Sequence, residues 1–395
     1  MIQPFSIARL PRIEFGGGVI AKLPQLAAQY GKRALLVTGR RSFLDSPQWE
    51  RLRKSLAELG FSLECLSVVD EPSPALVDGA VSKLRGEGIE VVIGIGGGSV
   101  LDAAKAIAGL LPTGSPVLDF LEGVGPERPY TGPALPFLAV PTTAGTGSEA
   151  TRNAVLGTHG PDGFKKSFRH ELLVPQYALV DPDLLISCPP TQIAANAMDA
   201  LTQLLESFVS LRANPWTDAL VESGLEAVRD GLFAWYDGGE DAAAGRAGLA
   251  YGALVSGICL AQTGLGAVHG MASPLGALFP IPHGVVCGTL VAVTTAANID
   301  ALRVRDPQNP AREKYARVGN LLSSREHDNP SKAREALVLT LTDWIAHLKL
   351  PRLGDLGVAN HDLPKIVAGA RGSSMKTNPI ILTDDELGEI LRRRL

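Results

Sequence analysis

The character of the sequence changes at Pro189-Pro190, near the middle of the chain. Before this pair, short apolar runs alternate with segments whose apolar residues recur at helical spacing, whereas after it long Ala- and Leu-rich stretches dominate. Alternating strands and helices favour a parallel sheet with helices on both faces. A chain of 395 residues is long enough to form two cores. We therefore predict an α/β domain with a parallel sheet over residues 1–188 and an all-helical domain over residues 189–395.

The expected strands are apolar and rich in β-branched residues, and they lie at residues 33–38, 62–69, 91–95, 137–140 and 177–180. The expected helices have apolar residues three and four positions apart, and they lie at residues 49–60, 74–86, 100–111, 191–211, 215–235 and 243–264.

The charge balance and the apolar runs exclude several classes of partner. The formal net charge is −4, and the basic cluster of residues 392–394 ends the chain, so nucleic-acid binding is not expected. We find no uncharged apolar run near the roughly 20 residues that span a bilayer, and residues 1–6 do not resemble a signal peptide. We expect no membrane partner and a cytoplasmic location.

The four cysteines, Cys65, Cys188, Cys259 and Cys287, are far apart and lie among apolar neighbours. Their spacing matches neither a CxxC-type zinc cluster nor a disulfide framework, so we expect buried free thiols. Free thiols fit a reducing cytoplasm.

Two segments rich in small residues follow neighbouring expected strands. Residues 94–99 read GIGGGS and open an expected helix, whose free N–H groups would suit a pyrophosphate. The spacing is neither GxGxxG nor a P-loop, and a simple tight turn is the alternative. Residues 141–149 read PTTAGTGSE and offer hydroxyl and backbone donors. Because open α/β sheets bind ligands at strand ends, the two segments together predict a nucleotide site.

The helical half carries an acid and two histidines at spacings that suit a buried divalent cation. Asp199 and Gln203 are four residues apart on one expected helix, as are His269 and Ser273 on another, so each pair shares a helix face. His283 follows His269 after fourteen residues. Each residue alone could be an ordinary core residue, but together they predict a metal site.

Six segments, ordered along the chain, resemble the iron-containing (group III) alcohol dehydrogenase family: GGGSVLDAAK, PTTAGTGSEAT, ALVDPDL, MDALTQLLES, HGMASPLGALFPIPHG and KTNP. The resemblance covers roughly residues 10–395. It implies a dehydroquinate synthase-like fold, with an α/β nucleotide-binding domain followed by an all-helical domain. It also implies a metal-dependent oxidoreductase that uses NAD(P), and a homodimer.

By the same resemblance, eight residues would contact the cofactor: Gly97, Gly98, Ser99, Asp102, Thr142, Thr143, Thr146 and Lys165. The first four would hold the pyrophosphate and neighbouring groups, and the threonines would lie nearer the ribose and nicotinamide. Lys165 falls where the family places a cofactor-contacting lysine, although beside Lys166 it could equally be a solvated surface residue.

The turn after the strand at 33–38 bears on the choice of dinucleotide. Family members that use NAD often carry an aspartate there, because a carboxylate binds the ribose hydroxyls and repels a 2′-phosphate. Here Gly39 leaves room, while Arg40, Arg41 and Ser42 offer donors. We predict NADP as the preferred cofactor, with NAD as the alternative; the arginines could also be ordinary exposed turn residues.

In the resembled family, an aspartate and three histidines bind the metal at the positions of Asp199, Gln203, His269 and His283, so this chain keeps three of the four. We expect one divalent metal, with Fe²⁺ favoured and Zn²⁺ as the alternative. Gln203 would be a poorer ligand than imidazole and would weaken metal retention or shift metal preference. Ser273 stands where many members place a histidine thought to relay the alcohol proton, and serine does not titrate near neutral pH.

The main functional hypothesis is an NAD(P)-dependent alcohol dehydrogenase or aldehyde reductase that transfers a hydride between the cofactor and a small alcohol, aldehyde or ketone. Its catalytic residues would be Asp199, His269 and His283. The alternatives are a reductase of an oxoacid or other anionic carbonyl compound, and an NADP-binding protein whose metal site has degraded.

Overall fold

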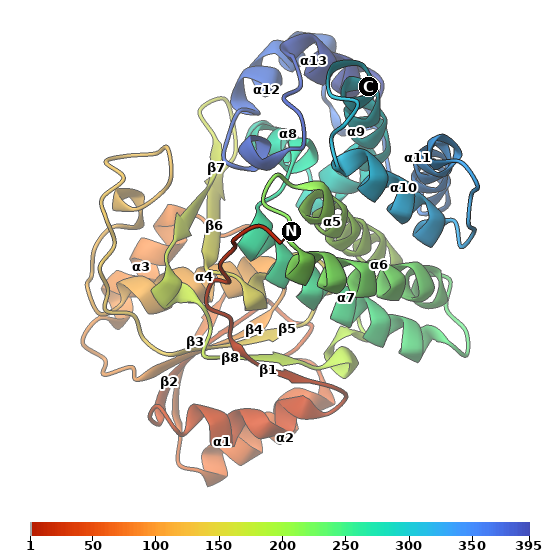
Figure 1. The fold of residues 1–395 in the computed structure, drawn as a ribbon. Coiled ribbons are helices and arrows are strands. Elements are labelled where there is room, and N and C mark those ends of the chain that lie inside the picture. The colour runs from red at the N-terminus through yellow and green to blue at the C-terminus, as the bar shows by residue number, and fades with distance from the viewer. Residues whose placement is uncertain (1) are drawn as a thin grey trace. The chain divides into compact units, whose positions relative to one another are not determined.

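The computed structural model describes residues 2–395, which form two compact units (Figure 1). The α/β unit contains residues 8–158 and 165–188, and the helical unit contains residues 2–7, 159–164 and 189–395.

The α/β unit is built on a six-stranded sheet in the order β1-β8-β5-β4-β2-β3, with parallel pairing between all neighbours. The strands of this sheet are β1 (Arg12–Phe15), β2 (Arg33–Thr38), β3 (Ser62–Ser67), β4 (Val91–Gly96), β5 (Phe137–Pro141) and β8 (Tyr177–Val180). Two further strands, β6 (Asn153–Thr158) and β7 (Phe164–Arg169), form a separate sheet. The helices are α1 (Leu23–Ala27), α2 (Pro47–Glu58), α3 (Pro74–Leu84) and α4 (Gly98–Leu110).

The five predicted strands and the predicted parallel sheet are confirmed, whereas β1, β6 and β7 were not predicted. All residues of β4 and β5 are buried, as expected for central strands of a parallel sheet. In contrast, β1 is short and partly exposed at the sheet edge, so it carries little of the apolar signal on which strand prediction depends.

The direction in which strands are added reverses between β2 and β4. From β2 the chain adds β3 on one side and then crosses over to add β4 and β5 on the other. Thr38 at the end of β2 is paired with Ile95 of β4, and Gly96 is paired with Pro141 at the end of β5. The segments that follow these three strands therefore begin at the same edge of the sheet, where open α/β sheets bind ligands.

The helical unit contains α5 (Pro190–Val209), α6 (Pro215–Tyr236), α7 (Ala242–Thr263), α8 (Ala267–Leu278), α9 (His283–Arg305), α10 (Ala311–Leu322), α11 (Pro330–His347), α12 (Leu363–Gly369) and α13 (Asp384–Arg392). Helix α5 is buried over most of its length and packs against α6, α7 and α9. Helices α6 and α7 approach closely, since a Cβ added to Gly231 would lie 2.6 Å from the carbonyl oxygen of Gly245. This packing holds the polar face of α5 inside the unit.

Two helices, α7 and α9, are long and apolar enough to cross a membrane by length and composition alone. In their most apolar windows, 61% and 67% of the residues are buried inside the protein. Burial of this extent is typical of core helices, so the composition of α7 and α9 is weak evidence for membrane insertion.

All four cysteines are free, but only Cys259 and Cys287 are buried. The prediction of four buried thiols was wrong for Cys65, which is exposed, and for Cys188, which is partly buried. Cys65 lies on β3, which forms an edge of the sheet and is largely accessible to solvent.

Candidate metal centre and nucleotide-binding loops

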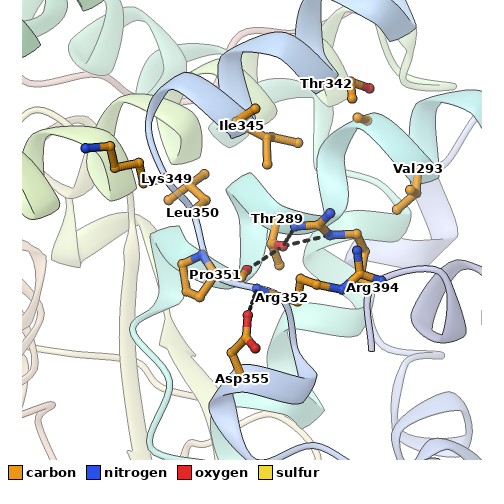
Figure 2. Close-up of a pocket in the computed structure, with 12 residues that line it drawn as sticks. Thr289, Val293, Thr342, Ile345, Lys349, Leu350, Pro351, Arg352, Asp355 and Arg394 are labelled. Atoms are coloured by element: carbon orange, nitrogen blue, oxygen red, sulfur yellow. Dashed lines mark hydrogen bonds between the residues drawn. The ribbon is translucent and has the colours of Figure 1, made fainter.

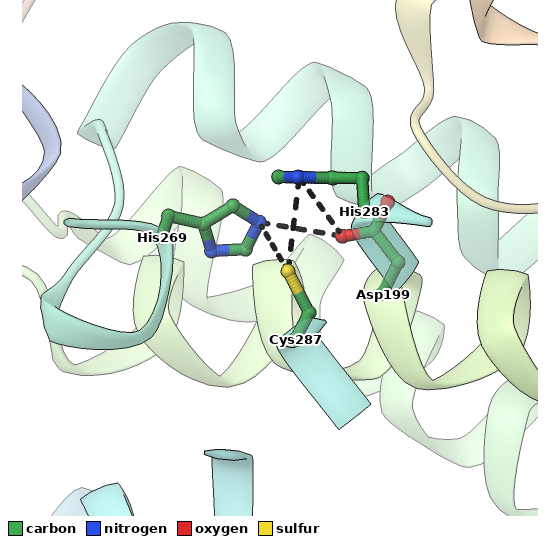
Figure 3. Close-up of side chains that lie close together, drawn as sticks. All are labelled: Asp199, His269, His283 and Cys287. Atoms are coloured by element: carbon green, nitrogen blue, oxygen red, sulfur yellow. Dashed lines mark hydrogen bonds and ion pairs between the residues drawn. The ribbon is translucent and has the colours of Figure 1, made fainter. Parts of the chain in front are cut away.

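Four side chains from three helices of the helical unit point toward one another (Figure 3). Asp199 comes from the middle of α5, His269 from the first turn of α8, and His283 and Cys287 from the first turns of α9. Their ligand atoms all lie within 4.8 Å of one another. The structure therefore brings together the predicted residues Asp199, His269 and His283, and adds a thiol that was not predicted to join them.

The nitrogen–oxygen separations within this cluster are longer than good hydrogen bonds. Nε2 of His269 and Nε2 of His283 lie 3.3 Å and 3.8 Å from Oδ1 of Asp199. Sγ of Cys287 lies 3.6 Å and 3.7 Å from the same two nitrogens. On a tetrahedral zinc ion with ordinary bond lengths, neighbouring ligand atoms would lie about 3.3–3.6 Å apart. The four atoms therefore surround a space that suits a metal ion.

Glu206, one further residue of α5, holds His269 in the orientation that a metal ligand needs. Its Oε2 accepts a hydrogen bond from Nδ1 of His269 at 2.7 Å. The same carboxylate accepts bonds from the backbone N–H groups of Gly266 and Val268 at the start of α8. With Nδ1 acting as the donor, the lone pair of Nε2 faces the cluster, which is the usual arrangement for a metal-binding histidine.

In the metal-free protein, the carboxylate of Asp199 and the imidazole of His269 stabilise each other's charged form. Burial alone would raise the pKa of Asp199, but His283 and His269 hold it below its usual value. Burial likewise opposes protonation of His269, but Cys287, Glu206 and Asp199 raise its pKa well above the usual value. Burial raises the pKa of the Cys287 thiol to about 12, and His269 opposes this rise. A divalent cation would replace the protons that these groups share.

The two residues that depart from the resembled pattern lie on the same helices. Gln203 is buried one turn after Asp199, and its Oε1 accepts a hydrogen bond from Ser256 Oγ of α7 at 2.7 Å. Ser273 is partly buried one turn after His269 on α8. Their roles as a weak ligand and as the site of a missing proton relay remain predictions.

In the α/β unit, the glycine loop after β4 and the threonine loop after β5 pack directly against each other. A Cβ added to Gly98 would lie 2.8 Å from the Thr146 side chain, and one added to Gly97 would lie 3.3 Å from Thr143. Gly97 is the N-cap of α4, and because glycine has no side chain it cannot cap the backbone N–H groups of the first turn. Because glycines leave this helix start open beside the threonines, the loops can present backbone N–H groups to a phosphate.

Asp102 and a lysine that we did not predict, Lys105, fasten the threonine loop to α4. Asp102 accepts hydrogen bonds from Ser148 Oγ at 2.5 Å and from the Val155 backbone N–H at 3.2 Å. Nζ of Lys105 donates to the Ser148 backbone carbonyl at 2.8 Å, and further to Ser148 Oγ, Thr151 Oγ1 and the Asn153 carbonyl. Burial lowers the pKa of Lys105 to about 8. Asp102 thus has partners inside the protein, and its predicted contact with the cofactor stays a prediction.

The remaining predicted cofactor residues differ in their surroundings. Arg40 and Ser42 are exposed in the turn after β2, and Gly39 lies beside them at the point where the sheet order reverses. Lys165 on β7 forms an ion pair with Glu71 at 2.5 Å. Ser99 is partly buried in the first turn of α4, and Thr142 is partly buried in the loop after β5.

A surface pocket of about 560 Å³ lies elsewhere in the helical unit, between α9, α11 and the chain end (Figure 2). Arg394 donates two hydrogen bonds to Thr289 there, and Asp355 accepts one from the Arg352 backbone N–H. Within the described residues, the pocket lining includes none of the predicted site residues.

Small-residue loops at the ends of neighbouring strands and a buried cluster of metal-type ligands are features of enzymes that use a dinucleotide together with a metal ion. A family model described as iron-containing alcohol dehydrogenase matches residues 11–182, and the model of the C-terminal part of the Fe-containing alcohol dehydrogenase family matches residues 193–395. The chain belongs to the iron-containing alcohol dehydrogenase family and is an oxidoreductase, and the predicted fold class is confirmed.

The relatives cover almost the whole chain. Alcohol dehydrogenase 4 of Schizosaccharomyces pombe is 31% identical over 99% of this chain and 89% of its own length. Lactaldehyde reductase of Escherichia coli is 29% identical over 90% of each chain. The structure of an archaeal halo-thermophilic alcohol dehydrogenase from a Red Sea brine pool has a TM-score of 0.91 at 26% identity, and covers 100% of this chain and 99% of its own.

Proposed function

We propose that this protein interconverts a small alcohol and its aldehyde or ketone, using NADP(H) as the hydride carrier and one divalent metal held by Asp199, His269 and His283. The observation that carries the proposal is the convergence of these three side chains on one buried space, with Glu206 orienting His269. Such a convergence of ligand atoms favours retained metal chemistry over a degraded site.

When bound, the metal supplies a Lewis acid that polarises the substrate oxygen. The protein's own part is to hold the ligands in place. Asp199 supplies a carboxylate that its histidine neighbours keep ionised, and Glu206 fixes the orientation of His269. Ser273 cannot act as an acid or base near neutral pH, so its hydroxyl can only pass on a proton that another group or water supplies.

The choice of NADP(H) rests on the turn after β2. Arg40, Arg41 and Ser42 are exposed at the carboxyl end of β2, beside the strand that leads into the glycine loop. Cationic and hydroxyl donors at this position favour a ribose that carries a 2′-phosphate. A comparison of kcat/KM for NADPH and NADH tests this choice, and a clear preference for NADH would contradict it.

The substrate class follows from the relatives. Curated relatives over most of the chain are named alcohol dehydrogenases and a lactaldehyde reductase, which supports small alcohols and aldehydes as substrates here. Two further proposals concern assembly and location. Family resemblance supports a homodimer, and the four free thiols fit a reducing, cytoplasmic location. Sedimentation of the purified protein tests the dimer.

The direct test is removal of the metal with a chelator, followed by reconstitution with Fe²⁺ or Zn²⁺ and assays with short aldehydes, ketones and alcohols in both directions. We expect the activity to disappear and return with the metal, and the Asp199→Asn variant to stay inactive. Asp343→Asn, which changes an exposed aspartate of α11, is the matched control. Full activity of the chelator-treated protein would contradict the proposed function.

A further inference from the structure

We propose that Cys287 is the fourth protein ligand of the metal, binding through Sγ as a thiolate, and that Gln203 stays outside the coordination sphere. This inference rests on the proposed metal site of Asp199, His269 and His283. It changes the chemical character of that site, because a carboxylate and a thiolate would share the ion with two imidazoles.

The first argument is position. His283 and Cys287 are four residues apart on α9, so their side chains leave the same helix face and meet the cluster side by side (Figure 3). Sγ of Cys287 lies 3.6 Å from Nε2 of His269 and 3.7 Å from Nε2 of His283. For a sulfur and a nitrogen bound to the same tetrahedral zinc ion, the expected separation is about 3.6 Å.

The second argument is that the other polar side chains nearby, Gln203 and Glu206, already have hydrogen-bond partners within the protein. Oε1 is the atom through which the Gln203 carboxamide would bind a metal, and it accepts the hydrogen bond from Ser256. Glu206 uses both carboxylate oxygens on His269 and on the backbone of α8. The thiol of Cys287, in contrast, has the two proposed histidine ligands as its neighbours.

A comparison within the protein separates this thiol from an ordinary core cysteine. Cys259 on α7 is as fully buried as Cys287, with 0% of each residue exposed. The sulfur of Cys259 faces the backbone carbonyl of Thr217 at 3.8 Å. Cys287 instead faces two imidazoles beside a carboxylate. A metal ion bound among these groups would stabilise the thiolate form of Cys287.

Coordination breaks the S–H bond of Cys287, forms a sulfur–metal bond and releases one proton to solvent, with no change in oxidation state. The charges of Asp199 and the thiolate then balance those of a divalent cation, so the ion and its four ligands are neutral together. Thiolate is a softer ligand than imidazole or a carboxamide, and it favours Zn²⁺. This donor set therefore points to zinc, whereas the family resemblance alone led us to expect iron.

Cobalt substitution tests the proposal, because a thiolate bound to Co²⁺ gives a near-ultraviolet charge-transfer band that oxygen and nitrogen ligands do not give. The full-length protein is stripped of metal, loaded with Co²⁺ and examined as wild type, Cys287→Ser and Cys259→Ser. We expect the band in the wild type and in Cys259→Ser, and its loss in Cys287→Ser. Competition with a chromophoric chelator measures the zinc affinity. Loss of a group that only supports a ligand typically lowers metal affinity about 10-fold to 100-fold, so Cys287→Ser, which removes a ligand, should lower it by about 10-fold or more.

Two results would overturn the inference, and they have different meanings. If cobalt binds in a manner that Asp199→Asn abolishes, but the charge-transfer band is absent or persists in Cys287→Ser, then the metal site stands and Cys287 is not its ligand. If the wild type binds neither cobalt nor zinc, the proposed metal site fails together with this inference. Thermal unfolding of each variant shows whether it is folded.

Discussion

Oε2 of Glu206 lies 2.7 Å from Nδ1 of His269. The same carboxylate accepts hydrogen bonds from two backbone N–H groups at the start of α8. One side chain of α5 therefore fixes both the helix that carries His269 and the direction in which the imidazole points. Metal-binding histidines depend on such partners for their tautomer and orientation.

We expect Glu206→Gln to weaken zinc binding roughly 10-fold to 100-fold, because the amide holds the imidazole less firmly and makes its Nε2 less basic. Competition with a chromophoric chelator measures the affinity. Glu226→Gln, which alters an exposed glutamate of α6, should bind zinc like the wild type. A folded Glu206→Gln variant with unchanged zinc affinity would show that the hydrogen bond does not serve the metal.

The buried lysine of α4 gives a second prediction. Replacing Lys105 by Met would leave the carboxylate of Asp102 and the oxygens of Ser148, Thr151 and Asn153 without their cation. Breaking a buried charge pair typically costs about 3–5 kcal/mol, so we expect a loss of unfolding free energy of that order in urea titrations. Lys83→Met, on the exposed side of α3, should change it by less than about 0.5 kcal/mol. Similar stabilities of the two variants would contradict the role given to Lys105.

The free energy of unfolding should depend on pH through Glu149, at the end of the threonine loop. Burial raises the pKa of Glu149 from its ordinary 4.5 to about 7. Because the folded protein holds this proton more tightly than the unfolded chain, the stabilisation is complete below about pH 4.5 and is lost as the pH rises through about 7. Between these limits we expect the wild type to lose up to about 3 kcal/mol relative to Glu149→Gln, whose side chain is always neutral. Parallel stability curves of the two proteins over this range would refute the prediction.

The turn after β2 gives a prediction about cofactor choice. A Cβ at Gly39 would meet no atom within 4 Å, so an aspartate fits without displacing its neighbours. We expect Gly39→Asp to shift the ratio of kcat/KM for NADPH over NADH toward NADH by roughly 10-fold to 100-fold, since its carboxylate repels a 2′-phosphate and binds ribose hydroxyls. Gly39→Ala adds bulk without charge and should leave the ratio near that of the wild type. An equal shift in both variants would show that charge is not the cause.

The fold was largely predictable because the central strands are uniformly apolar and the helices have clear periodicity. Strand β4 and helix α5 are buried almost throughout, so burial and sequence pattern coincide there. The short edge strand β1 and the partly buried β6 and β7 have no such pattern. Strand β1 also pairs with β8, which lies far away in the chain, whereas β6 and β7 are close in sequence and pair with each other.

The metal cluster was predictable only in part. Asp199, His269 and His283 are polar residues in apolar helices and attract attention for that reason. Cys287 does not, because a cysteine among valines and a glycine has the composition of an ordinary core segment. Its signal was the spacing of four residues from His283, which places both side chains on one helix face. On α5, the spacing of Glu206 from Gln203 and Asp199 likewise places these side chains on one helix face.

The most direct test of the metal centre is a crystal structure of the zinc-loaded protein with anomalous differences recorded at the zinc edge. We predict one strong peak per chain, surrounded by Asp199, His269, His283 and Cys287. A peak that lies elsewhere, for example at the exposed His347 beside Asp237, or the absence of a peak in the cluster, would contradict a metal site built by α5, α8 and α9.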